Sequence, residues 1–161
     1  MESRERELFD YRDGKLYWKV RKSNSRTCVG QEAGCLHKGV GYFVVKYDRK
    51  SRNLHRVIWA YHYGEIEEGV LIDHINRDPL DNRIENLRAC NKAQNSANCK
   101  VNIRNKLGVK GVSMTRGGRF RSVIRKQGKL CYLGTFDTAE EANAAYVKAA
   151  KEHHGEFACG G

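Results

Sequence analysis

Residues 71–98 read LIDHINRDPLDNRIENLRACNKAQNSAN, and this stretch decides the fold of the centre of the chain. The run LIDHI at 71–75 predicts a strand that leads into a polar loop, and LRA at 87–89 predicts the strand that returns beside it. Asn91 and Gln94 have the spacing of a helix N-cap and its capping box, which predicts a short helix after the second strand. Residues 70–99 are therefore expected to form a ββα unit.

Three side chains of this unit have the chemistry of a hydrolytic site. Asp73 and Asn95 offer two hard oxygen ligands, which suit Mg²⁺ or Mn²⁺. Histidine is the residue type whose ordinary pKa lies closest to neutral pH, so His74 is a candidate general base. Asn86 is the nearest candidate to orient the His74 ring. Such a set fits phosphodiester hydrolysis, which needs an activated water and neutralised phosphate charge. Asp and Asn are also common turn formers, so the residue types alone leave a purely structural loop open.

The charge of the chain points to a polyanionic partner. Thirty Lys and Arg against nineteen Asp and Glu give a net charge of +11. Residues 101–136 contain Lys and Arg but no acidic residue, which is typical of a surface that contacts phosphates. We therefore expect double-stranded DNA as partner. No membrane association is expected, because no apolar run is long enough to span a bilayer and the charged start MESRERELFDY is unlike a signal peptide; the location is expected to be intracellular.

The part of the chain before the ββα unit is predicted to be rich in short strands. LFDY and KLYWKV flank the turn-forming pair Asp13-Gly14, and GYFVVKYD at 41–48 is a further run of aromatic and β-branched residues. LHRVIWAYHY at 54–63 has apolar residues at helical spacing, and Gly64 supplies its end. His55, at the start of this helix, is expected to be structural or to contact phosphate. Residues 1–99 are therefore predicted to form one β-rich domain.

The remainder is predicted to be a polar, basic linker at 100–110 and a second small domain at 111–161. KGVSMTRG, GRFRSVIRKQ and KLCYLGTF predict three strands, separated by Gly117-Gly118 and Gln127-Gly128. Thr138 and Glu141 form a capping-box pattern ahead of an alanine-rich helix. The predicted fold class is α+β, and this second domain is expected to be a three-stranded antiparallel sheet packed on one helix.

The central stretch closely resembles the HNH endonucleases of phages and introns, the homing type, through DHIN at 73–76, DNRIENLR at 81–88 and QNSAN at 94–98. The resemblance implies a ββα-metal motif in which Asp73 and Asn95 hold one divalent ion and His74 activates water. It also implies that Asn86 supports the loop that carries the histidine.

The final metal ligand departs from the pattern of many HNH nucleases. This chain has Asn where many HNH nucleases have a metal-binding His, which makes zinc a poorer candidate than Mg²⁺ or Mn²⁺. Asn91 or Asn98 would replace Asn95 as ligand if the helix began elsewhere. The six cysteines have no zinc-type spacing, so reduced thiols are expected and a structural zinc protein is disfavoured.

Residues 108–150 are similar to the plant Apetala-type, or ethylene-response-factor, DNA-binding domain. The shared landmarks are KGV, GRF, LGTFDTAEEA and AAY. The resemblance implies a sheet that lies in the DNA major groove with the helix behind it. Strand alternation places three arginines of the central strand region on one face. The predicted DNA-contacting residues are Lys110, Ser113, Arg119, Arg121, Arg125 and Tyr132.

Together these features predict a metal-dependent DNA endonuclease of the homing or nicking type that hydrolyses phosphodiester bonds in double-stranded DNA. We expect a phage-encoded monomer without a small-molecule cofactor. A single ββα centre cuts one strand per encounter, so a monomer is expected to nick. The alternative is a DNA-binding regulator whose nuclease centre is degenerate.

Overall fold

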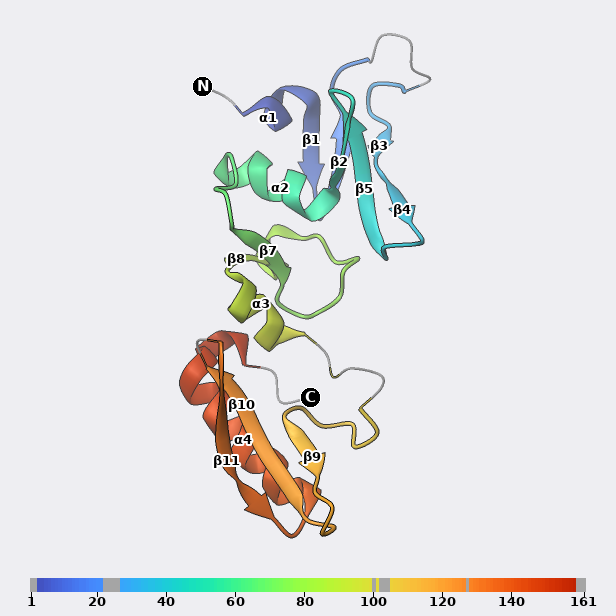
Figure 1. The fold of residues 1–161 in the computed structure, drawn as a ribbon. Helices are drawn as coiled ribbons and strands as arrows, with labels where there is room; N and C mark the ends of the chain where they lie inside the picture. The colour runs from blue at the N-terminus through green and yellow to red at the C-terminus, as the bar shows by residue number, and fades with distance from the viewer. Residues whose placement is uncertain (1–2, 22–26, 100, 102–104, 127, 159–161) are drawn as a thin grey trace. The chain divides into compact units, whose positions relative to one another are not determined.

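A computed structural model describes residues 3–21, 27–99, 101, 105–126 and 128–158. The chain forms two compact units, Met1–Cys90 and Asn91–Gly161, each with its own helices and small antiparallel sheets (Figure 1). The mixed α and β composition agrees with the predicted α+β class. In the described ranges, the helices are too short or too polar to cross a membrane. The predicted domain limits, 1–99 and 111–161, stay a prediction, and residues 100 and 102–104 of the predicted linker lie outside the described ranges.

Two three-stranded sheets make up much of the first unit. One contains β1 (Phe9–Arg12), β2 (Lys15–Trp18) and β3 (Glu32–Ala33), and the other contains β4 (Cys35–His37), β5 (Tyr42–Tyr47) and β6 (Lys50–Asn53). The strands predicted at LFDY, KLYWKV and GYFVVKYD are confirmed. The short strands β3, β4 and β6 and the helix α1 (Arg4–Leu8) were not predicted, because two to five residues are too few to show a clear periodicity.

The core of the first unit lies between these sheets and α2 (Leu54–Tyr63). Leu54 and Ile58 are buried and Tyr61 is half-buried against the core, as the helical spacing predicted, and Val57 is buried beside them. They pack in a cluster with aromatic and aliphatic residues of the sheets, among them Phe9 and Val45. The helix ends at Gly64, whose φ of 87° suits glycine. This packing fixes the helix start, which carries His55.

A two-stranded hairpin completes the first unit. β7 (Leu71–His74) pairs antiparallel with β8 (Leu87–Cys90), and the register places Asp73 opposite Arg88 and His74 opposite Leu87. The short 3-10 helix η1 (Ile84–Asn86) leads into β8. The predicted strand pair is therefore confirmed, and His74 lies where the strand ends and the loop begins.

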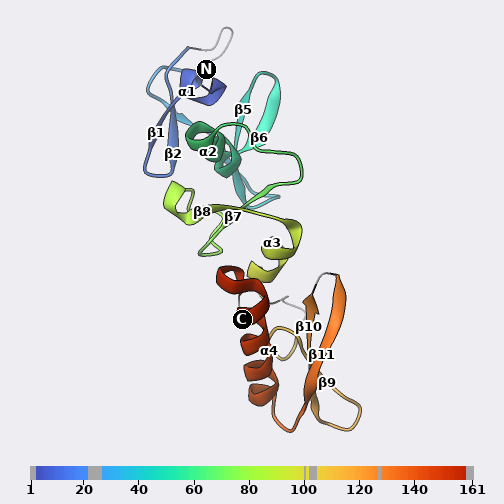
Figure 2. The same ribbon diagram turned by 90° about the vertical axis from the view of Figure 1, so that its left-hand side faces the viewer.

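The second unit begins with α3 (Lys92–Asn98), which has the predicted capping box between Asn91 and Gln94. A sheet of β9 (Val112–Met114), β10 (Phe120–Lys126) and β11 (Lys129–Phe136) follows, with β10 in the middle. α4 (Ala139–His154) packs along this sheet and begins with the predicted Thr138–Glu141 capping box (Figure 2). The chain continues into the 3-10 helix η2 (Gly155–Phe157). The expected three-stranded sheet on one helix is confirmed as a local fold.

Gly111 lets the chain pass close to Val123 and Tyr146 in the second unit. Gly111 has a φ of 67°, and a Cβ on it would lie 2.5 Å from the carbonyl oxygen of Val123. The same Cβ would also overlap the ring of Tyr146 on α4. No other residue therefore fits where the chain enters β9.

Candidate active site

His74 is a buried histidine held by a buried asparagine. Its side chain is 6% exposed, and its Nε2 lies 3.2 Å from Oδ1 of Asn82, which is itself 3% exposed. Asn82 Nδ2 donates to the carbonyl oxygen of Leu80 at 3.2 Å. That bond orients the amide so that its oxygen faces the histidine, and Nε2 must then carry the proton. A neutral His74 consequently has its lone pair on Nδ1.

Asp73, the neighbour of His74 on β7, forms an ion pair with Arg88 across the hairpin. Arg88 donates from Nε at 3.2 Å and from a terminal nitrogen at 3.1 Å to the same oxygen, Oδ2. Both side chains are about one tenth exposed, 11% for Arg88 and 10% for Asp73. A buried carboxylate needs such a partner, because an unpaired buried charge is strongly destabilising. The pair therefore holds the Asp73 carboxylate in place on the hairpin.

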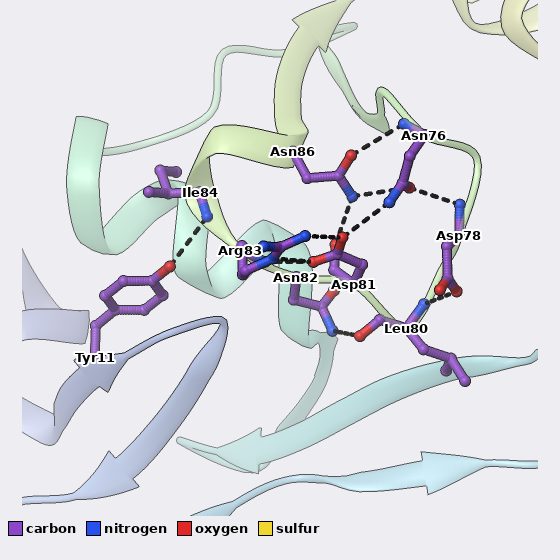
Figure 3. Close-up of polar contacts among 9 residues, drawn as sticks. All are labelled: Tyr11, Asn76, Asp78, Leu80, Asp81, Asn82, Arg83, Ile84 and Asn86. Atoms are coloured by element: carbon purple, nitrogen blue, oxygen red, sulfur yellow. Dashed lines mark hydrogen bonds and ion pairs between the residues drawn. The ribbon is translucent and has the colours of Figure 1, made fainter.

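The loop after His74 is held by side-chain hydrogen bonds that centre on Asn86 (Figure 3). Its Oδ1 accepts from the backbone N–H of Asn76, and its Nδ2 donates to Oδ1 of Asn76 and to the carbonyl oxygen of Asp81 at 2.7 Å. Nε2 of His74 meets Asn82, and a direct contact of Asn86 with the histidine stays a prediction. Asn86 fixes the conformation of the loop that follows His74, the role that the resemblance implied.

Asp81 is the second anchor of this loop. Its carboxylate accepts from Asn76 Nδ2 at 2.8 Å and from the Arg83 guanidinium at 2.8 and 2.9 Å (Figure 3). The hydrogen bond from Arg83 lowers the pKa of Asp81 to about 2. Asp78 closes a further turn by accepting from the backbone N–H of Leu80. These Asp and Asn residues are thus turn formers, as their residue types allow.

The β1–β2 hairpin braces the other side of the loop. Tyr11 Oη accepts from the backbone N–H of Ile84 at 3.0 Å (Figure 3). Gly14, in the β1–β2 turn, approaches so closely that a Cβ on it would lie 2.8 Å from the backbone nitrogen of Arg83. The loop that contains Asn82 is therefore supported by residues from the beginning of the chain.

A second buried histidine lies beside His74. The ring centroids of His55 and His74 are 4.9 Å apart, and the planes meet at 70°. Tyr42 of β5 lies near both rings. Burial, His74 and Arg56 lower the pKa of His55 to about 3, so it is neutral under ordinary conditions. The surroundings of His74 are thus aromatic on one side and polar at Asn82.

Asn95, the other predicted metal ligand, lies on α3 in the second unit and is half-buried. Of the two alternatives, Asn91 uses its Oδ1 to accept from the backbone N–H of Gln94, and Asn98 is 6% exposed. Among the described residues, no three His, Cys, Asp or Glu side chains gather in a group that could hold a metal. Joint binding of an ion by Asp73 and Asn95 therefore stays a prediction.

The predicted DNA-contacting residues lie in different surroundings in the second unit. Arg121 and Arg125 are exposed on β10, where the residues between them, Ser122 and Ile124, are buried, so the predicted alternation is confirmed for this strand. Ser113 is the register partner of Arg121, and the exposed Tyr132 shares a hydrogen bond with Thr135. The two remaining candidates, Arg119 and Lys110, already have protein partners: Asp137 for the first and the carbonyl oxygen of Ala97 for the second.

Two neighbours of the Asp73–His74 pair were not singled out in the sequence. Arg88 could have been found, because the antiparallel register of the predicted hairpin places one residue opposite Asp73. Asn82 had no comparable signal, since its contact with His74 depends on how the whole loop folds back.

Comparisons with known proteins agree with this site. Residues 52–97 match a protein-family model described as HNH endonuclease, a segment that contains α2, the hairpin and most of α3. The chain is 32% identical over 110 residues to Protein 3.8 of Escherichia phage T7, which covers 68% of this chain and 90% of that protein.

A second relative is named Uncharacterized HNH endonuclease L560, from Acanthamoeba polyphaga mimivirus. It is 33% identical over 121 residues, which are 74% of this chain and 63% of that protein, so the chain spans less than two thirds of this relative. No solved structure matches the chain. The family model and the viral relatives together show that the chain belongs to the HNH endonuclease family.

Proposed function

We propose that the protein is a metal-dependent DNA endonuclease that hydrolyses phosphodiester bonds in double-stranded DNA, one strand per encounter. The observation that carries the proposal is the oriented His74, whose Nε2 meets Asn82 Oδ1 inside the segment that matches the HNH model. A buried, neutral histidine with one nitrogen bound to an amide oxygen has the arrangement of a general base. The viral relatives agree with a phage or viral origin.

In this proposal His74 removes the proton from the attacking water. Because Asn82 keeps the proton of the neutral ring on Nε2, the accepting atom is Nδ1. The Asn82 oxygen then stabilises the imidazolium that forms, since it still accepts a hydrogen bond from Nε2. Asn86 keeps the loop in the shape that brings Asn82 to His74.

Asp73 and Asn95 are proposed to hold one Mg²⁺ or Mn²⁺, which would neutralise charge that develops on the phosphate. Their oxygens form the sparse, hard donor set that suits these ions, because substrate phosphate and water complete the coordination. Arg88 holds the Asp73 carboxylate in place through two hydrogen bonds to Oδ2. Asn91 already caps α3, which supports Asn95 as the amide ligand.

The sheet of the second unit is proposed to bind the DNA, in the manner implied by its resemblance to Apetala-type domains. Arg121 and Arg125 support this, because both are exposed on one face of β10. Lys110 and Arg119 are weaker candidates, since their side chains bind Ala97 and Asp137. Ser113 and Tyr132 remain candidates for contacts from the neighbouring strands.

Supercoiled plasmid is the substrate that tests the proposal. The wild-type protein with Mg²⁺ or Mn²⁺ should convert it to open circles before linear product appears, and addition of EDTA should stop the conversion. His74→Ala should bind the same DNA with nearly unchanged affinity while single-turnover cleavage falls roughly 10²–10⁴-fold, the usual contribution of a general base. A wild-type protein that binds DNA without cutting it would instead identify a DNA-binding regulator with a degenerate centre.

A further inference from the structure

We propose that His55 is a positioning residue, whose ring holds the imidazole of His74 in its working orientation together with the ring of Tyr42. The inference rests on the proposed function, because it assigns His55 to the support of the proposed general base. The three rings come from three elements: Tyr42 begins β5, His55 lies in the first turn of α2, and His74 ends β7.

The rings of His55 and Tyr42 lie beside the ring of His74. The His55 ring meets His74 nearly edge-on, with centroids 4.9 Å apart and planes at 70°. The Tyr42 ring is stacked with His74 at 6.2 Å and 29°, and it lies 5.4 Å from His55. His74 is therefore flanked by one ring that is nearly perpendicular to it and one that is nearly parallel.

The flanking rings add to what the Asn82 hydrogen bond does. That bond restrains Nε2, and the ring contacts act on the plane of the imidazole. A base must keep its accepting nitrogen directed at the attacking water, and a small misplacement of a reacting group strongly reduces the rate. Contacts with the two flanking rings restrict the tilt of this plane.

The ring of His55, rather than its Nδ1, is the part that can position His74. Its Nδ1 is fully buried and has no hydrogen-bond partner among the described residues. Burial of a polar nitrogen without a compensating hydrogen bond is unfavourable, so this nitrogen adds no stabilising contact. The contacts that His55 does make in this region are ring contacts with His74 and Tyr42.

The family match includes this helix. The segment that matches the HNH endonuclease model begins at residue 52, ahead of α2, and so contains both His55 and His74. α2 contacts β5, β6 and β7, which brings its first turn to the end of β7. The histidine pair is therefore a feature of the matched segment.

The test compares His55→Ala, which removes the ring, with His55→Phe, which keeps a flat ring and removes both nitrogens. Two-bond ¹H–¹⁵N spectra of the labelled full-length protein report the tautomer and order of His74 without any cleavage assay. Wild type and His55→Phe should show a single Nε2–H tautomer for His74, and His55→Ala should show averaged nitrogen shifts. Single-turnover cleavage should fall about 10–100-fold in His55→Ala, with DNA affinity retained, and recover in large part in His55→Phe.

Two further variants complete the test. Tyr42→Leu removes the parallel ring and should also disturb the His74 signals, which keeps the inference testable if His55→Ala does not fold. His153→Ala is the matched control, because His153 is exposed on α4 in the second unit and should leave His74 unchanged. Unchanged His74 spectra in both His55→Ala and Tyr42→Leu, or a His55→Phe protein as impaired as His55→Ala, would overturn the inference. If wild type itself does not cut DNA, the proposed function fails, while the spectra still decide the role of His55.

Discussion

Oδ1 of Asn82 lies 3.2 Å from Nε2 of His74, and the two side chains are 3% and 6% exposed. The distance is within hydrogen-bonding range, and the bond from Asn82 Nδ2 to the carbonyl oxygen of Leu80 keeps the amide oxygen toward the histidine. This arrangement favours the Nε2–H tautomer of a neutral His74. The proposed chemistry uses Nδ1 as the accepting atom for that reason.

We therefore predict that Asn82→Ala lowers single-turnover DNA cleavage about 10–100-fold, the usual effect of losing a residue that orients a catalytic group. DNA affinity should change little, because Asn82 is buried. Equal rates for Asn82→Ala and wild type would show that His74 does not depend on this partner.

The metal proposal predicts a change in ion dependence. Asp73→Ala and Asn95→Ala should each raise the Mg²⁺ or Mn²⁺ concentration needed for half-maximal cleavage, because each removes an oxygen ligand. This ion dependence is measured by titrating each ion and recording the single-turnover cleavage rate. Asn98→Ala is the comparison variant, and Asn98 is 6% exposed. If Asn95→Ala keeps the wild-type ion dependence and Asn98→Ala does not, the ligand is Asn98.

Local patterns in the sequence were sufficient to predict most of the helices and strands. The capping boxes at Asn91–Gln94 and Thr138–Glu141 each consist of residues three positions apart, so they are visible in the sequence and both are present in the structure. The alternation of Arg121, Ser122 and Ile124 likewise follows from the two-residue period of a strand. Short strands such as β3 were missed, because pairing with a distant partner stabilises them.

The surroundings of the site could be predicted only in part. Asp73 and His74 were found because adjacent residues in a recognisable motif need no knowledge of the fold. The contacts of His74 with Asn82, His55 and Tyr42 depend on loop conformation and on packing between elements. No sequence periodicity reports such contacts.

Acid stability should depend on His55. Its pKa in the folded protein is about 3, well below the ordinary value of 6.5, because of burial and of the neighbouring His74 and Arg56. Between these two values the unfolded chain binds more protons than the folded protein. The stabilisation is therefore complete above pH 6.5, falls as the pH decreases, and levels off near pH 3, with a slope of at most about 1.4 kcal/mol per pH unit.

Urea denaturation from pH 7 to pH 4 measures this dependence. His55→Phe cannot take up the proton, so its free energy of unfolding should fall less steeply than that of wild type. The difference between the two proteins isolates His55, since carboxylates and the other histidines contribute to both curves. Parallel curves would contradict the assigned pKa.

The close approach of Gly14 to the His74 loop predicts a specific loss of stability. Gly14 and Gly30 have similar φ values, 79° and 81°, so an alanine at either position has the same backbone strain. Only at Gly14 would the added Cβ meet a neighbour, the Arg83 nitrogen at 2.8 Å; at Gly30 nothing lies within 4 Å. Gly14→Ala should therefore lower the free energy of unfolding by about 1–3 kcal/mol more than Gly30→Ala does. Equal losses of unfolding free energy for Gly14→Ala and Gly30→Ala, measured by thermal or urea denaturation, would show that the loop moves away from the added Cβ without strain.

The DNA-binding proposal predicts that Arg121 and Arg125 matter more than Arg119. Arg119 is ion-paired with Asp137, whereas the other two are exposed on β10 beside residues that face α4. If Arg121 or Arg125 binds a base edge, its change to Ala should cost about 1–3 kcal/mol on the preferred site only. If it binds a phosphate, affinity should fall on all sequences, and the slope of log affinity against log salt should decrease by about one.

Fluorescence anisotropy with two DNA sequences at several salt concentrations separates these outcomes. Arg119→Ala is the matched control, because it removes the same charge from a side chain that already has an acidic partner. Its salt slope should stay closer to that of wild type than the slopes of Arg121→Ala and Arg125→Ala. If all three variants keep both the wild-type slope and the wild-type preference, this face of the sheet does not bind DNA, and the contacts must come from other basic residues of the chain.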